Sequence, residues 1–197
     1  MSASDRVLRL IHKKVDLSQH MTLNRYREEY RKMHVTIYTD GAARGNPNGP
    51  GGYAAILEYT DPRGILHTRE CFGAYEKTTN NRMELLAAIV GLEALNRPCD
   101  VDLYSDSKYL VDAFNSGWVD GWLKKNWKKS DGEPVKNIPL WQRLLKAKEP
   151  HTVVFHWVKG HAGHPQNERC DQLASAAADE GPWLSDDGLG DLSEKSM

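Results

Sequence analysis

The chain has 197 residues, of which 40% are hydrophobic and 27% are charged, and its formal net charge is -1. These values predict one soluble globular domain with its own core, and no apolar stretch is long enough to span a membrane. The three cysteines are widely spaced and form no CxxC pair, which argues against a disulfide framework or a zinc site and favours reduced thiols in a cytoplasmic protein.

Residues 1–33 differ in charge from the rest of the chain. They hold eight Lys and Arg against four Asp and Glu, and basic residues interrupt the apolar centre that a secretory signal needs. Apolar residues recur there at helical spacing, which predicts two short amphipathic helices. This N-terminal extension could pack on the main domain, bind a protein partner or stay partly disordered. Met33 could also be a translation start.

A main domain is expected over residues 34–180. Turn-forming Gly, Asn and Pro separate three strand-like segments, after which helical and strand-like patterns alternate. The expected strands are 35–39, 53–59, about 65–73, 101–105 and 152–158. The expected helices are about 80–96, 107–115, 138–148 and 166–179. This order predicts an α/β (α+β) fold, a mixed five-stranded sheet flanked by helices. Residues 181–197 are acidic and Gly-rich, and are expected to be a disordered tail.

Four acidic residues in different local settings form the candidate site. Asp40 and Asp106 each follow an apolar strand-like run, Glu84 lies near the start of a helix, and Asp171 lies on the last helix. If the two strands are adjacent and parallel, Asp40 and Asp106 lie side by side at a sheet edge where ligands bind. A single acid is most often a solvated surface residue. Four that converge would repel each other without cations, and oxygen ligands suit Mg2+ or Mn2+, as two-metal phosphodiester chemistry requires.

Seven segments, in matching order and spacing, make residues 35–179 very similar to bacterial-type ribonuclease HI. The segments are Tyr38–Gly41, Gly45–Pro47, Pro50–Tyr53, Thr78–Glu84, Ser105–Ser107, Trp157–His164 and Asn167–Asp171. The resemblance implies the ribonuclease H-like fold. It also implies an endonuclease that cuts the RNA strand of RNA–DNA hybrids with two divalent metal ions and leaves 5′-phosphate and 3′-hydroxyl ends.

The resemblance also implies roles for individual residues. Asp40, Glu84, Asp106 and Asp171 match the carboxylates that bind two Mg2+ ions, for which Mn2+ could substitute, and Asp40 would bridge both ions. His161 lies in a loop bounded by Gly and Pro, where a His is usually an ordinary surface residue. The matching flanks instead imply that His161 assists proton transfer or product release. All five residues are therefore expected to be catalytic.

Residues 118–129 carry four lysines against one Asp. They could form a solvated helix with inward tryptophans, a basic protrusion that grips a nucleic-acid backbone, or both. The resemblance implies a protrusion that contacts the DNA strand. The candidate contacts in this segment are Trp118, Trp122, Lys124, Lys125, Lys128 and Lys129.

Short polar residues near the acids are further candidates for hybrid binding. By resemblance, Asn46 and Thr79 match a DNA-phosphate pocket, and Asn80 and Asn81 match minor-groove contacts. Thr79 or Asn80 could also cap the helix that follows. Lys108 stands where Gln is familiar in the family and could add a charged contact. The 42–50 turn is one residue longer than the closest family pattern, which could move the first phosphate contacts.

Three other functions are compatible with parts of the sequence. A catalytically weak or inactive hybrid-binding module would keep the fold, although all four acids and His161 are present. Another nuclease or recombinase of the same broad fold is disfavoured by the basic segment and the 159–164 loop. A small-molecule enzyme with a phosphate-binding 45–52 turn is disfavoured because Pro47 and Pro50 remove amide donors. The expected partner is an RNA–DNA hybrid, and the expected state is a monomer.

Overall fold

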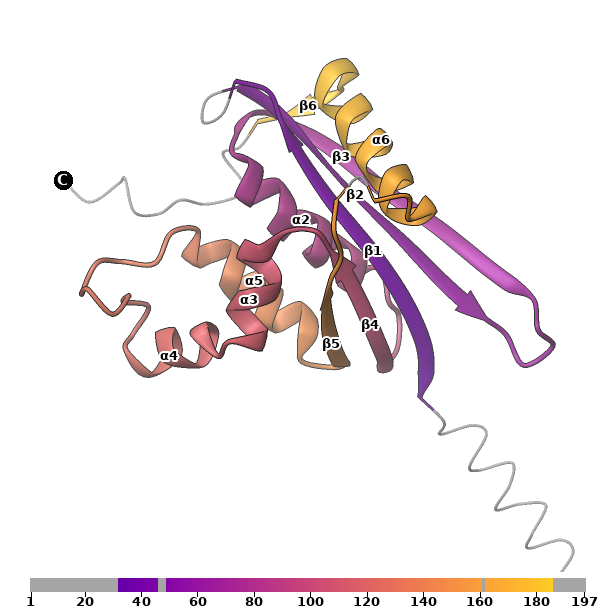
Figure 1. Ribbon diagram of the computed structural model, residues 1–197, viewed down its shortest axis with the longest axis horizontal. Helices are drawn as coiled ribbons and strands as arrows, with labels where there is room; N and C mark the ends of the chain where they lie inside the picture. The colour runs from indigo at the N-terminus through magenta and orange to yellow at the C-terminus, as the bar shows by residue number, and fades with distance from the viewer. Residues whose placement is uncertain (1–31, 46–48, 161, 186–197) are drawn as a thin grey trace, which may run out of the picture. The chain divides into compact units, whose positions relative to one another are not determined.

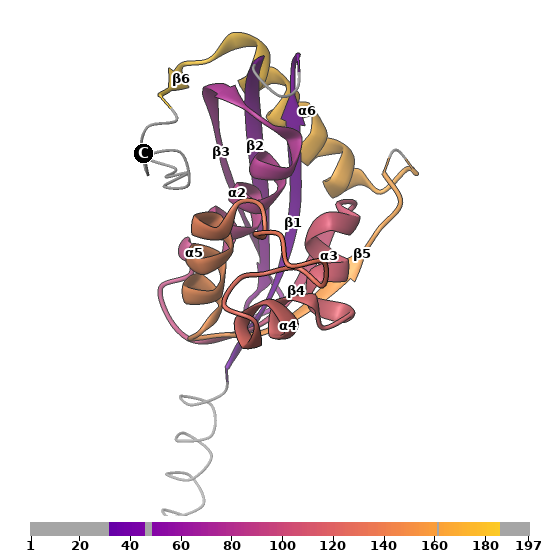
Figure 2. The same ribbon diagram turned by 90° about the vertical axis from the view of Figure 1, so that its left-hand side faces the viewer.

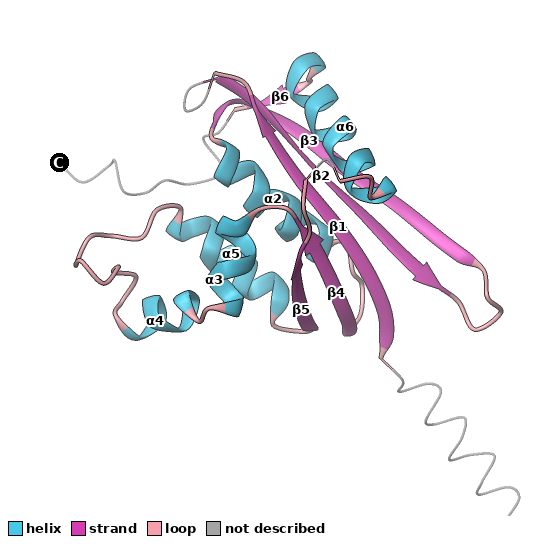
Figure 3. Cartoon of the chain, in the orientation of Figure 1, coloured by secondary structure: helices cyan, strands magenta, loops and turns pink. Residues whose placement is uncertain are grey.

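One mixed sheet organises the part of the chain that the computed structural model describes, residues 32–45, 49–160 and 162–185 (Figure 1). The strands are β1 (Met33–Ala43), β2 (Gly49–Thr60), β3 (Leu66–Thr78), β4 (Cys99–Ser105), β5 (Thr152–Trp157) and β6 (Trp183–Leu184). The helices are α2 (Asn80–Glu93), α3 (Lys108–Asn115), α4 (Trp118–Lys124), α5 (Ile138–Lys148) and α6 (Pro165–Glu180). Figure 3 shows this alternation of strands and helices, which confirms the expected α/β (α+β) class.

The strand order is β5-β4-β1-β2-β3-β6. β1, β2 and β3 form an antiparallel meander, whereas β1, β4 and β5 run parallel to one another. Parallel neighbours need crossover connections, and α2 and the α3–α5 region provide them. This arrangement puts the C-terminal ends of the parallel strands β1, β4 and β5 at the same end of the sheet, where the candidate site is expected.

The described residues contain a sixth strand that the sequence analysis does not predict. Trp183 and Leu184 pair in parallel with Ala74 and Tyr75 at the outer edge of β3. The indole N–H of Trp183 also donates to the carbonyl oxygen of Ala178 at 2.9 Å. The expectation of a tail disordered from residue 181 is therefore wrong for these two residues, because backbone pairing and the indole hydrogen bond order them. Residues 186–197 lie outside the described part.

Alternating side chains of the sheet build two cores. On β2, Ala55 and Leu57 face the larger core with α2, whereas Ala54 and Ile56 face α6. Figures 1 and 2 show α6 on one side of the sheet and α2, α3 and α5 on the other. The sequence predicts one apolar face for α2, but most of the helix is buried because it lies between the sheet and α5.

Aromatic packing attaches the α3–α5 region to the larger core. Trp141 on α5 is fully buried, and the rings of Tyr109, Phe114 and Trp122 meet it edge-on at centroid distances of 5.3, 6.1 and 5.2 Å. The chain leaves α4 through Asn126 and Trp127, both at positive φ, so the 118–129 segment is only partly helical. None of the helices in the described residues is long and apolar enough to cross a membrane.

Candidate active site

Asp40 and Asp106 come from neighbouring parallel strands. Thr39 and Ser105 are the last residues paired between β1 and β4, and each aspartate follows directly. β1 itself continues along β2, where Asp40 pairs with Ala54. Asp40 therefore marks the end of the parallel pairing rather than the end of its strand. β1 and β4 are therefore adjacent and parallel, as expected, and their pairing places both carboxylates at the same end of the sheet.

Glu84 reaches this end of the sheet because α2 approaches β1 very closely. A Cβ atom at Gly41 would lie 2.4 Å from the backbone nitrogen of Glu84, so only glycine allows the helix this position. Thr79 caps the helix, since its side chain accepts a hydrogen bond from the Arg82 N–H at 3.4 Å. The cap sets where α2 begins. As a result, ligand oxygens of Asp40, Glu84 and Asp106 all lie within 4.8 Å of one another.

Burial and like charge act together on these carboxylates. Asp40 is 7% exposed, and burial, followed by the charge of Asp106, raises its pKa to about 7 even though the Gly41 N–H donates to it. Glu84 is 4% exposed, and burial, followed by the charges of Asp40 and Asp106, raises its pKa well above the usual value. Such a cluster holds negative charge at neutral pH only at a high energetic cost, which a cation would remove.

The hydrogen bonding of Glu84 is consistent with a metal site. Its Oε1 atom accepts from Asn80 Nδ2 at 3.3 Å, but its buried Oε2 atom has no hydrogen-bond partner among the residues described. A buried carboxylate oxygen without a donor is costly. Three all-oxygen ligands with one unsatisfied oxygen fit a hard divalent cation such as Mg2+ or Mn2+. The residues present therefore fit the metal that the resemblance implies.

Asp171 lies on α6 and is not part of this set of three. Its Oδ1 atom accepts a hydrogen bond from Ser175 at 3.4 Å, one helical turn further on. Its charge still raises the pKa of Asp40, so it acts on the same site electrostatically. Cys170 and Ala174 hold α6 against the sheet. The structure thus brings three of the four predicted acids together and places the fourth beside them.

Two predicted site residues, Asn46 and His161, lie outside the described residues. The segment that leads to position 161 is nevertheless informative. A Cβ atom at Gly160 would lie 2.4 Å from Asp106 Oδ2, so the main chain passes directly against that carboxylate. After the loop, the ring of His164 lies 5.1 Å from the ring of Tyr38. The loop that carries His161 therefore begins at the candidate site.

The polar candidates for nucleic-acid binding have different surroundings. Thr79 serves as the helix cap, Asn80 donates to Glu84, and Asn81 is exposed. Lys108 is the exposed first residue of α3, and its Nζ atom lies 5.0 Å from the centroid of the Trp157 ring. These four residues follow β3 or β4 in the chain and flank Glu84 or Asp106 in sequence.

The basic segment has an inner and an outer side. Trp122 is partly buried against Trp141, whereas Trp118 is 44% exposed. Lys124, Lys125, Lys128 and Lys129 are all exposed, and Lys129 Nζ lies 3.2 Å from an oxygen of Asp131. The anchoring tryptophan and the exposed lysines are consistent with a solvated helix that has inward tryptophans. They are equally consistent with a basic protrusion that grips a nucleic-acid backbone.

Trp157 has no individual role in the sequence analysis, but its indole N–H donates to the main-chain carbonyl of Asp106 at 3.0 Å. Trp157 lay within the predicted 152–158 strand, so it was already assigned to an element that could lead to the site. Its role became interpretable only once β5 was known to lie beside β4. Ser175 was missed for a similar reason, although its spacing of four residues from Asp171 places both on one helix face.

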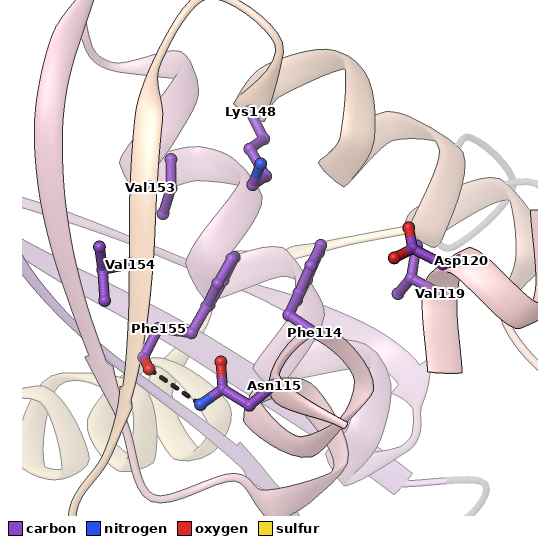
Figure 4. A pocket seen from close by; sticks show the side chains of 8 residues that line it. All are labelled: Phe114, Asn115, Val119, Asp120, Lys148, Val153, Val154 and Phe155. Carbon is purple, nitrogen blue, oxygen red and sulfur yellow. Dashed lines mark hydrogen bonds between the residues drawn. The ribbon is translucent and has the colours of Figure 1, made fainter. Parts of the chain in front are cut away.

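A separate pocket of about 340 Å3 lies beside β5, between α3, α4 and the end of α5 (Figure 4). The rings of Phe114 and Phe155 stack at 4.0 Å, and Asn115 donates to the carbonyl of Phe155 at 3.1 Å. Lys148 and Asp120 complete its lining together with three valines. None of the predicted site residues lines this pocket, so it is distinct from the carboxylate cluster.

Comparisons with known proteins point to one family. A family model described as RNase H matches residues 32–179. The chain is 68% identical over 157 residues to a ribonuclease H of Lachnoclostridium phytofermentans, with 80% of this chain and 99% of that protein covered. It is 53% identical over 154 residues to a ribonuclease H of Shewanella sp. strain ANA-3, with 78% and 93% covered.

A solved structure also resembles the described fold. The crystal structure of LC9-RNase H1, a type 1 RNase H with the type 2 active-site motif, superimposes with a TM-score of 0.69 at 35% identity. The alignment covers 75% of this chain and 73% of that chain. Sequence and structure therefore agree on the same family.

Proposed function

The chain belongs to the ribonuclease H family, and on this premise we propose that it hydrolyses the RNA strand of RNA–DNA hybrids, leaving 5′-phosphate and 3′-hydroxyl ends. The observation that carries the proposal is the convergence of Asp40, Glu84 and Asp106 within 4.8 Å. We assign the catalysis to a domain of residues 34–180. A role for residues 1–33 in binding a protein partner stays a prediction, because residues 1–31 lie outside the described residues.

Asp40, Glu84, Asp106 and Asp171 would hold the divalent ions, with Mg2+ as the expected metal and Mn2+ as a substitute. Two such ions, when bound, supply a water of lowered pKa and stabilise the charge that develops on the departing 3′-oxygen. The charges of both Asp106 and Asp171 raise the pKa of Asp40, which supports Asp40 as a ligand that would serve both ions.

The contribution of the protein is to hold charge in place before the substrate arrives. Rigid strands carry Asp40 and Asp106, and the close contact at Gly41 fixes the helix that carries Glu84. Preorganised ligands need little rearrangement during the reaction, and this usually accounts for most of the rate gain in such sites. Asp171 approaches from α6, a separate element, and its hydrogen bond to Ser175 gives it a defined starting position.

Hybrid selectivity would arise from contacts with both strands. The 2′-hydroxyl group distinguishes the RNA strand at the cleaved bond. A pocket built from Asn46 and Thr79 would take a DNA phosphate, and Asn80 and Asn81 would reach the minor groove between the strands. The exposed lysines of the 118–129 segment would hold the DNA backbone. Such a division of contacts disfavours RNA–RNA duplexes.

The proposed function is tested by cleavage of a hybrid labelled on each strand in turn, with Mg2+ and with EDTA. We expect cutting of the RNA strand alone, absent in EDTA, with new 5′-phosphate and 3′-hydroxyl ends. RNA–RNA, DNA–DNA and single-stranded RNA substrates should remain intact. Tight binding without cutting would contradict the proposal and identify an inactive hybrid-binding module, whereas equal cutting of RNA–RNA duplexes would contradict the hybrid specificity.

His161→Ala is expected to slow turnover while retaining measurable cleavage. By its resemblance to the family, His161 would act as an acid or base in proton transfer or product release, so we expect kcat to fall about 10- to 100-fold with little change in KM. The measurement is steady-state cleavage of the hybrid beside His67→Ala, a His on the β2–β3 hairpin that pairs with Asp61. A loss as complete as that of Asp40→Asn would show that His161 has a more central role.

A further inference from the structure

Trp157 lies at the end of β5, next to the strand that leads to Asp106. It pairs with Ser105 in the parallel register, and its indole N–H donates to the main-chain carbonyl of Asp106 at 3.0 Å. The N–H of Val158 donates to the carbonyl of Ser105, also at 3.0 Å. The end of β5 therefore holds the backbone around Asp106 with two successive hydrogen bonds.

The chain after Trp157 also contacts the carboxylate of Asp106 itself. Gly160 lies so close that a Cβ atom there would be 2.4 Å from Asp106 Oδ2. Asp106 is thus contacted at its main-chain carbonyl by Trp157 and at its carboxylate by the Gly160 backbone. Any shift of the β5 end would move this metal-binding candidate.

The ring of Trp157 has a second neighbour. It is 46% exposed, and Lys108 Nζ lies 5.0 Å from its centroid. A cation over the face of a tryptophan ring is attracted by the charge distribution of the ring. Because Lys108 is two residues after Asp106 and opens α3, this contact restrains an ammonium group close to the carboxylate site. An incoming nucleic-acid backbone would meet that charge beside the site.

We propose that Trp157 is a positioning residue for hybrid cleavage, with its indole N–H aligning Asp106 and its ring holding the Lys108 ammonium toward a backbone phosphate near the cleaved bond. This inference rests on the proposed function. The two actions are separable. Alignment of Asp106 acts on turnover, because small displacements of reacting groups slow chemistry. Placement of Lys108 acts on substrate binding, because phosphate contacts are largely electrostatic.

Two substitutions separate these actions. Trp157→Phe keeps an aromatic face but lacks the N–H donor, and we expect kcat to fall about 5- to 50-fold with KM within about twofold. Lys108→Gln removes the charge, so KM should rise about 3- to 10-fold, the salt slope of binding should fall by about one, and kcat should stay within about twofold. The salt slope is measured with Asp40→Asn also present, so that the hybrid is not cut.

Trp157→Leu tests the coupling between the ring and Lys108. It removes the donor and the ring face, so both kcat and KM should worsen. If the ring acts through Lys108, then Lys108→Gln should raise KM less in the Trp157→Leu background than in the wild-type chain. An equally large rise in both backgrounds would overturn the role of the ring.

Trp183 provides a matched control. It is 43% exposed, its indole N–H also donates to a main-chain carbonyl, and it lies on β6 at the opposite edge of the sheet. Trp183→Phe should therefore leave kcat and KM unchanged, while thermal melting checks that each variant is folded. If the wild-type chain cuts hybrids and Trp157→Phe behaves like Trp183→Phe, the positioning role of Trp157 is overturned alone. If the wild-type chain cuts no hybrid, the proposed function fails and this inference fails with it.

Discussion

Asp40→Asn is expected to abolish hybrid cleavage and, in the absence of divalent metal, to stabilise the folded protein at neutral pH. The amide is nearly the same size as the carboxylate but carries no charge and is a poorer ligand for hard cations. Loss of this proposed ligand of the divalent ions should lower kcat by about 10³-fold or more. Cleavage retained by this variant at saturating Mg2+ would contradict the assignment of Asp40.

The stability effect follows from the raised pKa of Asp40. The pKa rises from 3.8 in the unfolded chain to about 7 in the folded one. Between these values the folded state binds more protons, so wild-type stability falls as pH rises and stays low above about pH 7. Glu84 acts in the same direction. At about 1.4 kcal/mol per pH unit, Asp40→Asn should gain roughly 2–4 kcal/mol at neutral pH and little below about pH 4.

Thermal melting in EDTA measures this gain. At about pH 8 the melting temperature of Asp40→Asn should exceed that of the wild type by roughly 5–10 °C, and the difference should shrink toward about pH 4. Added Mg2+ should raise the melting temperature of the wild type far more than that of the variant. If the variant melted below the wild type at the higher pH, the charge of Asp40 would not destabilise the folded protein in the absence of metal.

Asp61→Asn is a control for which we expect the opposite change in folding stability at neutral pH. Hydrogen bonds from the Ile65 N–H and from Arg63 lower the pKa of Asp61 to about 2. Its stabilising contribution is therefore present above the unfolded pKa and lost as pH falls through the folded value. Asp61→Asn should lower stability at neutral pH and leave hybrid cleavage unchanged. The two aspartates thus predict opposite shifts from the same chemical substitution.

Replacement of Lys124, Lys125, Lys128 and Lys129 by Gln is expected to have the second largest effect, on binding rather than on chemistry. Each lost phosphate contact reduces the salt slope of log Kd by about 0.9, so up to four contacts should lower it by about three to four. Affinity at moderate salt should fall about 10²- to 10³-fold. Lys129 should contribute least, since it already pairs with Asp131.

The measurement is hybrid binding over a series of KCl concentrations, with Asp40→Asn present so that the hybrid is not cut. Replacement of Lys124 and Lys125 alone is compared with replacement of Lys146 and Lys148, two lysines on α5. The first pair should lower both the affinity and the salt slope, and the second pair should change neither appreciably. If the fourfold variant kept its affinity and slope, the 118–129 segment would not be the protrusion that grips the hybrid.

Some structural features were readable from local patterns alone. Residues such as Thr79 predict a helix cap because a side-chain hydroxyl can satisfy a free N–H of the first turn, and the structure confirms this cap. Strand-like apolar segments bounded by turn residues predicted the strands, although β1, β2 and β3 extend further than expected. Strand ends are harder to predict, because partner strands rather than local sequence decide how far the backbone pairing continues.

The burial of α2 and the strand at Trp183 could not be predicted in the same way. α2 is buried around most of its surface because α5 covers the side that faces away from the sheet, and that contact joins residues far apart in the chain. Trp183 and Leu184 form β6 only because the edge of β3 is available for pairing. Both depend on neighbours that composition and periodicity do not reveal.

The sequence by itself determined the family and the α/β class, and it identified the four acidic residues as candidate metal ligands. It could do so because the order of motifs and the chemistry of residues can be read along the chain. Only the tertiary structure decided that Asp40, Glu84 and Asp106 form a tight set with Asp171 beside it, and that Trp157 contacts both Asp106 and Lys108. The physical reason is that strand order and the close approach of α2 at Gly41 set these distances. Those distances, through burial and charge repulsion, set the raised pKa of Asp40.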